Sequence, residues 1–191
     1  MTIQELFVAA NRALLQSVSQ IKPHQWDIPL PEESSTRPTN LRDAVRYHTY
    51  DDAWVPDVLA GKTAEEVGDG YEPLLKNEDV LAEFTKYNEL ASQTVGGFDD
   101  LDRVVHLSYG DFSAKEYLQH ITSFRALRAY DIAALVGADT KMADDYVDAL
   151  QHEYEPEIEF YRQVGVFPAA VEVPADADKQ TKLLAMFGRT A

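Results

Sequence analysis

With 191 residues, 45% of them apolar and 26% charged, the chain has the length and composition of a globular domain with a sizeable core. Its formal net charge of −16 argues against binding to nucleic acid or to an anionic membrane surface, because both carry negative charge themselves. The lack of cysteine excludes disulfides, thiolate metal ligands and a cysteine nucleophile.

Helical periodicity dominates the chain, with apolar residues recurring every three or four positions. Asn40 predicts the N-cap of one helix, and Ser113 with Glu116 forms a capping box that predicts the start of another. Pro56 and Pro156 are expected to bend the helices in which they lie. The predicted helices cover residues 2–21, 40–61, 78–95, 113–137 and 140–163.

The segments between these helices predict little sheet. Residues 22–38 contain four prolines and are expected to form an ordered loop, whereas residues 103–110 form the one convincing short strand. Residues 164–178 are expected to be extended, before a short helix that Gly188 stops. The predicted fold is all-α, an up-and-down four-helix bundle with an extended C-terminal arm (about 164–191) and a short terminal helix, in one domain of residues 1–191.

Two observations favour a cytoplasmic protein. No apolar run approaches the roughly 20 residues of a membrane span. The N-terminal segment is amphipathic and carries an acidic residue, unlike a signal peptide. We therefore expect neither a membrane partner nor a nucleic-acid partner.

The conspicuous single residues have structural explanations. Trp26 and Trp54 are expected in the core, and His152 is expected on a solvated helix face. His24 and His106 have no partner at the spacing of metal ligands. Phosphate-binding glycine loops, the zinc-binding His-Glu-x-x-His pattern and serine nucleophile elbows are all lacking from the sequence.

Several segments, in a fixed order along the chain, carry a resemblance to a known family. They are HQWDIPLP, LRDAV, WVPDVLAGKTAEEVGD, VVHLSYGDFSAKEYLQHIT, YDIAALVG and the tail VFPAAVEVPADADKQTKLLAMFGR. Together they resemble the DinB/YfiT-like superfamily, in the actinobacterial branch related to the metal-binding N-terminal domain of mycothiol-dependent maleylpyruvate isomerase. The resemblance implies a DinB-like four-helix bundle, often a homodimer, with a pocket for a divalent metal. Characterised members transfer or isomerise their substrates with a low-molecular-weight thiol.

The resemblance also implies where the metal ligands should lie. The first ligand position follows Arg42 by five residues and falls on Tyr47. The other two precede the aromatic–Asp pair that ends at Asp131, and they fall on Phe124 and Arg128. Phenylalanine cannot ligate a metal and arginine would repel one, so we expect the family's metal site to be lost and no cofactor to be bound.

A metal site with shifted ligands is the alternative. His48, Asp51 and Asp52 lie close together on the second helix and could hold zinc or nickel, with His120 as a distant fourth candidate. However, His48 is rotated by about 100° from Tyr47 around the helix. We therefore expect His48 to be exposed rather than part of the pocket.

Arg128 interrupts an otherwise apolar stripe of the fourth helix. If it is buried it needs an acid, and Asp51 is the best candidate, with the Tyr47 hydroxyl as a further acceptor. Trp54 and Asp131 would support this pocket. Otherwise Arg128 extends out through the pocket mouth, with only its aliphatic stem packed.

Three functions remain open from the sequence. The first is a small-molecule binding protein, a non-metal descendant of the thiol-dependent enzymes, in which Arg128 receives an anionic ligand. The second is a metal-dependent, mycothiol-type thiol transferase or isomerase with shifted ligands. The third is a structural module whose bundle face mediates dimerisation. Whether the protein is an enzyme is therefore undecided, and no catalytic residue is assigned.

Overall fold

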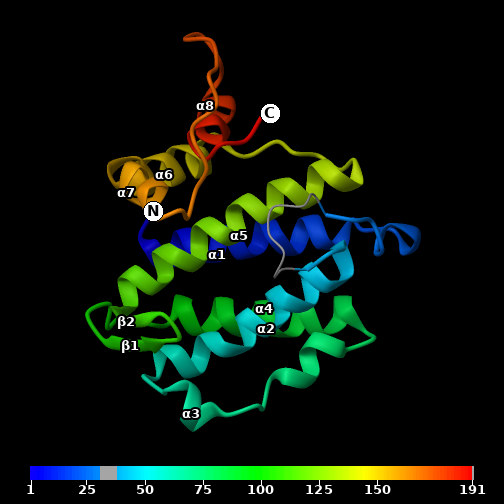
Figure 1. The fold of residues 1–191 in the computed structure, drawn as a ribbon, viewed down its shortest axis with the longest axis vertical. Helices are drawn as coiled ribbons and strands as arrows, with labels where there is room; N and C mark the ends of the chain where they lie inside the picture. The colour runs from blue at the N-terminus through cyan, green and yellow to red at the C-terminus, as the bar shows by residue number, and fades with distance from the viewer. Residues whose placement is uncertain (31–37, 191) are drawn as a thin grey trace. The chain divides into compact units, whose positions relative to one another are not determined.

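A computed structural model describes residues 1–30 and 38–190 of the chain (Figure 1). The chain divides into two compact units, Thr2–Asp139 and Thr140–Ala191, the second of which also includes Met1. Helices dominate both units, so the prediction of an all-α class is confirmed. No described helix is both long enough and apolar enough to cross a membrane. The single domain predicted for residues 1–191 stays a prediction.

Long helices form most of the first unit. They are α1 (Ile3–Ser19), α2 (Leu41–Leu59), α4 (Val80–Gly96) and α5 (Ala114–Val136). Shorter elements connect them, namely η1 (Pro23–Gln25), α3 (Ala64–Val67), η2 (Glu72–Lys76), β1 (Val104–Leu107) and β2 (Gly110–Ser113). Helix α1 packs against α4 and α5, and α2 packs against α4.

Local side-chain chemistry explains where two of these helices begin. The Asn40 side chain accepts a hydrogen bond from the backbone N–H of Asp43, at 2.9 Å, and so caps α2. The Ser113 hydroxyl accepts from Glu116 N, while the Glu116 carboxylate accepts from Ser113 N. Helix α5 then ends at Gly137, in the left-handed conformation that glycine adopts easily. Both predicted N-caps are confirmed.

Two clusters of buried apolar side chains hold the first unit together, and all four long helices contribute to each. The hairpin-end cluster consists of Ile3, Phe7, Val55, Val58, Leu59, Ala91, Val95, Val105, Ala114, Tyr117 and Leu118. The opposite cluster consists of Leu14, Val18, Ile21, Leu41, Val45, Val80, Phe84, Ala129, Ile132 and Val136.

The clusters also fix the direction of each helix. Helices α1 and α5 run from the hairpin-end cluster to the opposite cluster, whereas α2 and α4 both run the other way. The predicted strict up-and-down alternation is therefore wrong for α2 and α4, which are parallel to each other. The connection through residues 60–79 allows this, because its 20 residues can return along the roughly 28 Å length of α2.

The connecting segments differ from expectation in two places. The predicted strand over 103–110 is one half of an antiparallel hairpin, in which Val104 pairs with Ser113 and Leu107 with Gly110. The helices α3 and η2 lie between residues 61 and 78, where we predicted no helix. Of the predicted loop over 22–38, residues 31–37 lie outside the described residues. Trp26, within the same loop, packs against the opposite cluster as expected.

The second unit is built around a helix that Pro156 breaks. The predicted helix over 140–163 is divided into α6 (Asp144–Tyr154), η3 (Glu155–Glu157) and α7 (Ile158–Gln163). Helix α8 (Lys179–Met186) packs against α6, where the Tyr154 and Phe187 rings lie 5.7 Å apart. The short terminal helix is confirmed, and His152 is exposed as predicted.

Candidate functional site

A layer of buried polar side chains separates the two hydrophobic clusters of the first unit. On α1, for example, Asn11 lies between Phe7 of one cluster and Leu14 of the other. Each of these polar residues is at most 2% exposed. We call the following six residues the polar layer: Asn11 from α1, His48 and Asp52 from α2, Asn88 from α4, and Thr122 and Arg125 from α5.

The centre of the polar layer is an ion pair between α5 and α2. Arg125 Nε donates to Asp52 Oδ1 at 3.0 Å, and Nη2 donates to the same oxygen. Arg125 Nη1 donates to the carbonyl of Ile121 at 3.0 Å, and the guanidinium lies 5.1 Å from the Phe7 ring. Burial would lower the pKa of Arg125, but the carboxylates of Asp52 and Asp51 raise it above its ordinary value.

Burial acts on Asp52 in the opposite sense. It raises the pKa of the Asp52 carboxyl, and the Arg125 guanidinium opposes that rise by attraction and by hydrogen bonding. Because arginine stays protonated, this contact favours the charged carboxylate. We therefore treat the pair as a salt bridge whose two charges cancel. Asp52 Oδ2 has no hydrogen-bond partner among the described residues.

Two asparagines join α1 to α4 in the same layer. Asn11 Nδ2 donates to the Asn88 carbonyl at 3.0 Å and to Ser92 Oγ at 3.1 Å. Asn88 Nδ2 donates in return to the Asn11 carbonyl at 3.1 Å. The Asn88 side chain also lowers the pKa of Asp52, so it lies close to the ion pair. The asparagines and the ion pair therefore form one connected layer.

His48 is buried, and the prediction of an exposed histidine is wrong. Only 2% of it is exposed, and its ring lies 4.9 Å from the Phe124 ring. Burial lowers the pKa of His48 well below 6.5, and the charges of Arg128 and Arg125 lower it further. His48 is therefore neutral at pH 7. Its Nδ1 atom has no hydrogen-bond partner in the part of the chain that the structure describes.

The outer edge of this region contains the positions that the family resemblance assigned to metal ligands. We call Tyr47, His48, Phe124 and Arg128 the α2–α5 seam. The Arg128 guanidinium lies 5.7 Å from the Phe124 ring centre, and both residues are half-buried. Tyr47 is 46% exposed, so it lies outside the packed interior. The Phe124 ring thus lies near both the Arg128 guanidinium and the ring of the buried His48.

The fully buried arginine of this region is Arg125 and not Arg128, while the pairing of Arg128 with Asp51 stays a prediction. Asp51 and Arg128 are both half-buried, whereas Asp52 and Arg125 are 0% and 1% exposed. The prediction chose the wrong arginine because of the rotation of α5. The innermost stripe of this helix passes through Leu118, Thr122, Arg125, Ala129 and Ile132, so Phe124 and Arg128 each lie one position before a residue of that stripe.

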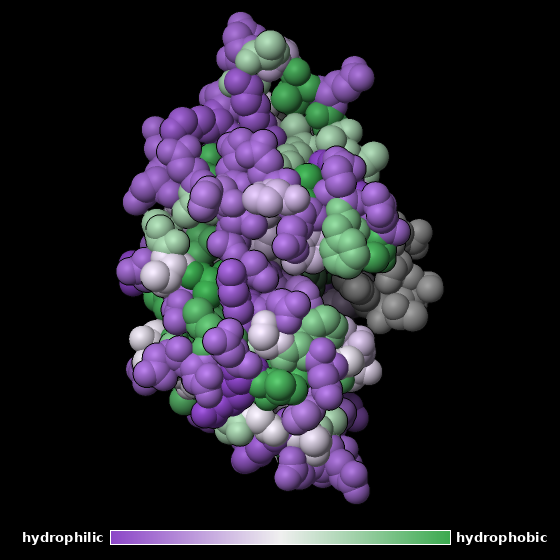
Figure 2. Space-filling view, turned by 90° about the vertical axis from the view of Figure 1, so that its left-hand side faces the viewer, coloured by the Kyte–Doolittle hydropathy of each residue, from purple (hydrophilic) through white to green (hydrophobic). Residues whose placement is uncertain are grey.

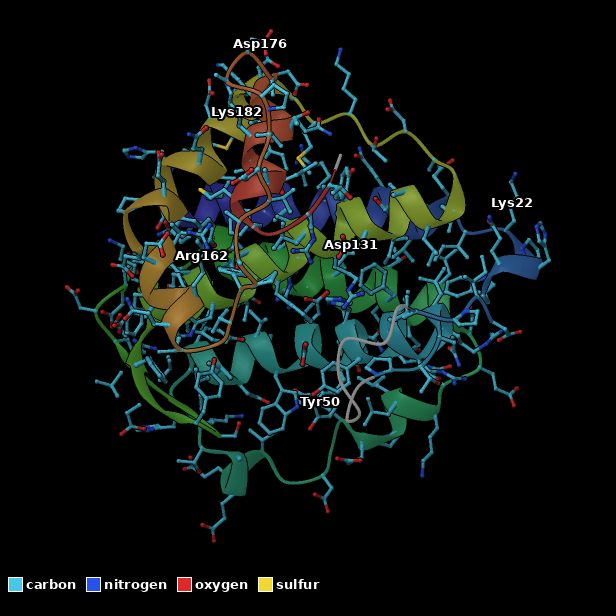
Figure 3. All side chains as sticks on the ribbon, turned by 45° about the horizontal axis from the view of Figure 1, so that its top comes forward. Lys22, Tyr50, Asp131, Arg162, Asp176 and Lys182 are labelled. Atoms are coloured by element: carbon cyan, nitrogen blue, oxygen red, sulfur yellow. The ribbon has the colours of Figure 1, made fainter. Side chains whose placement is uncertain are left out.

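The two predicted supporting residues lie on the same two helices. Trp54 is half-buried, packs against the hairpin-end cluster, and lies 6.0 Å from the Tyr50 ring and 5.7 Å from the Tyr71 ring. This agrees with the expectation of a core aromatic at Trp54. Asp131 is half-buried on α5; Figure 3 labels it there, and Tyr50 on α2.

The side chains of this region do not suit a divalent metal. Within residues 1–30 and 38–190, no group of three or more His, Asp or Glu side chains is placed to hold a metal ion. His48 and Asp52 lie one helical turn apart, but the Arg125 guanidinium contacts Asp52 and would repel a cation. The arrangement fits an internal salt bridge better than the shifted metal site.

The sequence did not draw attention to Arg125, Asn11 or Asn88. Each lies on a long helix where a polar residue would ordinarily face solvent. Each is buried at a position flanked by apolar residues three or four positions away on both sides. This interruption of an apolar stripe on α1, α4 and α5 was the signal that could have located the layer.

The comparisons with known proteins supply no relative. No protein-family model matches the chain, and no curated protein and no solved structure matches it either. The resemblance to the DinB/YfiT-like superfamily therefore stays a prediction.

Proposed function

We propose that this protein is a DinB-like four-helix bundle that has lost its family's metal site and binds a small anionic molecule at the α2–α5 seam. In this proposal Arg128 binds the anionic group, the Phe124 ring packs against an apolar part of the ligand, and the Tyr47 hydroxyl lies at the mouth of the binding site. The protein would act in the cytoplasm.

The electrostatics of the seam carry the proposal. Arg128 is half-buried, and its charge lowers the pKa of the neighbouring His48. Arg125 lies behind it, but Asp52 balances that charge. The seam therefore presents a half-buried guanidinium in a protein whose net charge is −16 and whose surface, in the view of Figure 2, is largely hydrophilic. A partly desolvated guanidinium forms strong paired hydrogen bonds with a carboxylate or phosphate.

The aromatic surroundings favour a carboxylate on a flat apolar group. Phe124 lies between Arg128 and His48, with its ring 5.7 Å from the guanidinium carbon and 4.9 Å from the imidazole. A planar ligand could pack on these rings while its carboxylate meets Arg128. Neutral His48 would not add a second positive charge, so a single negative charge is the best match.

Benzoate is a suitable probe, and benzamide is its neutral counterpart. We expect the wild-type protein to bind benzoate but not benzamide in a titration followed by NMR chemical shifts. Arg128→Gln should weaken benzoate binding at least about tenfold, which corresponds to losing one charge-assisted hydrogen bond of about 1.5–3 kcal/mol. Arg12→Gln removes the same charge from an exposed site on α1 and should change nothing. Failure of the wild-type protein to bind benzoate, acetate and inorganic phosphate would refute the proposal.

A metal-dependent thiol transferase or isomerase is the second candidate. One observation favours it: His48 Nδ1 and Asp52 Oδ2 are both buried without a hydrogen-bond partner among the described residues. The adjacent Arg125 guanidinium argues against it. Elemental analysis after dialysis against zinc or nickel separates the candidates, because only this one requires about one metal ion per chain.

A further inference from the structure

Four atoms of the polar layer are buried polar groups without a hydrogen-bond partner among the described residues. They are Asn11 Oδ1, His48 Nδ1, Asp52 Oδ2 and Thr122 Oγ1. Three helices contribute them, and their side chains are at most 2% exposed. Leaving such a group without a partner typically costs about 1–3 kcal/mol, so each of these atoms calls for a partner.

The chemistry of these atoms defines the partner. Asn11 Oδ1 belongs to a neutral amide and Asp52 Oδ2 to a carboxylate, and both oxygens can only accept hydrogen bonds, while Thr122 Oγ1 can donate or accept. The partner must therefore supply donors. It must also be uncharged, because Arg125 and Asp52 already balance each other and a cation would meet the guanidinium.

We propose that the polar layer is an internal hydration site, in which ordered water molecules bind Asp52 Oδ2, Thr122 Oγ1 and Asn11 Oδ1 between the two hydrophobic clusters. Water supplies two donors and two acceptors, carries no charge, and commonly satisfies buried polar groups of this kind. The polar layer shares His48 with the α2–α5 seam, but the three atoms proposed to bind water belong to other residues, so the hydration site does not depend on the function proposed for the seam.

On the α1–α4 side the polar layer lies next to the surface. An open groove with a volume of about 400 Å³ is lined there by residues that include Asn88 and Ser92. Asn11 donates hydrogen bonds to both of these residues, through the Asn88 carbonyl and the Ser92 hydroxyl. The groove therefore reaches the edge of the polar layer.

The test counts water molecules directly. Water ¹⁷O magnetic relaxation dispersion detects molecules that stay bound for longer than the protein takes to tumble. We expect wild-type protein to show a dispersion, Thr122→Val to reduce its amplitude, and Thr122→Ser to retain it, because serine keeps the hydroxyl. Thr49→Val is the matched control, since the buried Thr49 hydroxyl already donates to the Val45 carbonyl at 2.9 Å. That variant should leave the dispersion unchanged.

The effect of Thr122→Val on the stability of the protein is a second, independent test. If Thr122 binds water, Thr122→Val should lower the folding equilibrium constant about fivefold or more. The substitution removes a hydroxyl that has a hydrogen-bond partner and leaves the bound water with one partner fewer. If Thr122 has no partner, valine should raise that constant, because it removes an unsatisfied buried group. The proposal is overturned by a wild-type protein without dispersion, by an unchanged amplitude in Thr122→Val, or by a more stable Thr122→Val variant. The wild-type measurement decides alone if that variant does not fold.

Discussion

Replacing Asp52 with leucine would leave the guanidinium of Arg125 at 1% exposure without its carboxylate. Arg125 would keep its hydrogen bond to the Ile121 carbonyl, at 3.0 Å, the Phe7 ring beside its guanidinium, and the attraction of the half-buried Asp51 carboxylate. None of these replaces the buried carboxylate of Asp52. Breaking a buried ion pair in this way typically costs 3–5 kcal/mol, so we expect Asp52→Leu to lower the free energy of unfolding by about 4 kcal/mol.

The same reasoning predicts a smaller loss when both charges are removed. Arg125→Met alone leaves the buried Asp52 carboxylate without its partner and should also lower the free energy of unfolding by about 3–5 kcal/mol. The double variant Asp52→Leu with Arg125→Met leaves no unpaired charge, and its stability should lie within about 1–2 kcal/mol of the wild type. The coupling in this double-mutant cycle should therefore be several kcal/mol, well beyond ordinary additivity.

Urea unfolding followed by far-UV circular dichroism measures each of these free energies. The matched control is the pair of Arg42 and Asp27, which has nearly the same geometry, with Nε and Oδ1 3.1 Å apart, but a largely exposed carboxylate. Asp27→Leu should cost at most about 1 kcal/mol, as for other surface pairs. Equal costs for Asp52→Leu and Asp27→Leu would refute the assignment of Asp52 to a buried, charged layer.

Three further predictions concern single features. His48 has a lowered pKa in the folded state, so below about pH 6.5 the unfolded state binds more protons and stability should fall by up to about 1.4 kcal/mol per pH unit. His48→Phe should remove that slope between pH 7.5 and 5, whereas replacing the exposed His152 with glutamine should keep it. Ser113→Ala should lower the free energy of unfolding by about 1 kcal/mol through loss of the α5 cap, and Ser113→Thr should lose less. Elemental analysis after dialysis against zinc and nickel should find no stoichiometric metal, and one equivalent per chain would contradict the proposed loss of the site.

The local parts of the fold could be predicted from the sequence because their causes are local. The side chains of Asn40 and Ser113 bind backbone groups three residues away, and Gly137 ends the same helix that Ser113 begins. Pro156 marked the break between α6 and α7 for the same reason, whereas α2 continues through Pro56. Such signals require no knowledge of which helices become neighbours.

The orientation of the helices could not be predicted in the same way. Helix α5 buries residues on several of its sides, so its apolar pattern did not define one inward face. A stripe through Phe124 and Arg128 therefore looked as good as the true stripe through Thr122 and Arg125. A rotation by one position decided which arginine became the buried one.

The contacts of the polar layer are also distant along the chain. Arg125 and Asp52 are 73 residues apart, and Asn11 and Asn88 are 77 residues apart. Each residue alone resembles an ordinary solvated helix position. Only the packing of α1 on α4 and of α2 beside α5 gives them partners.

This layer offers a physical reason for the packing of the four helices in one register. A shift of α2 by one turn would move Asp52 into an apolar cluster and leave Arg125 without its carboxylate, which is costlier than misplacing an apolar side chain. The asparagines impose the same condition on α1 and α4, since each donates to the other's backbone carbonyl. If the double variant proves as stable as the wild type, the ion pair contributes mainly to this choice of register. Benzoate affinity of the double variant then reports whether the register is needed to hold Phe124 and Arg128 in the α2–α5 seam.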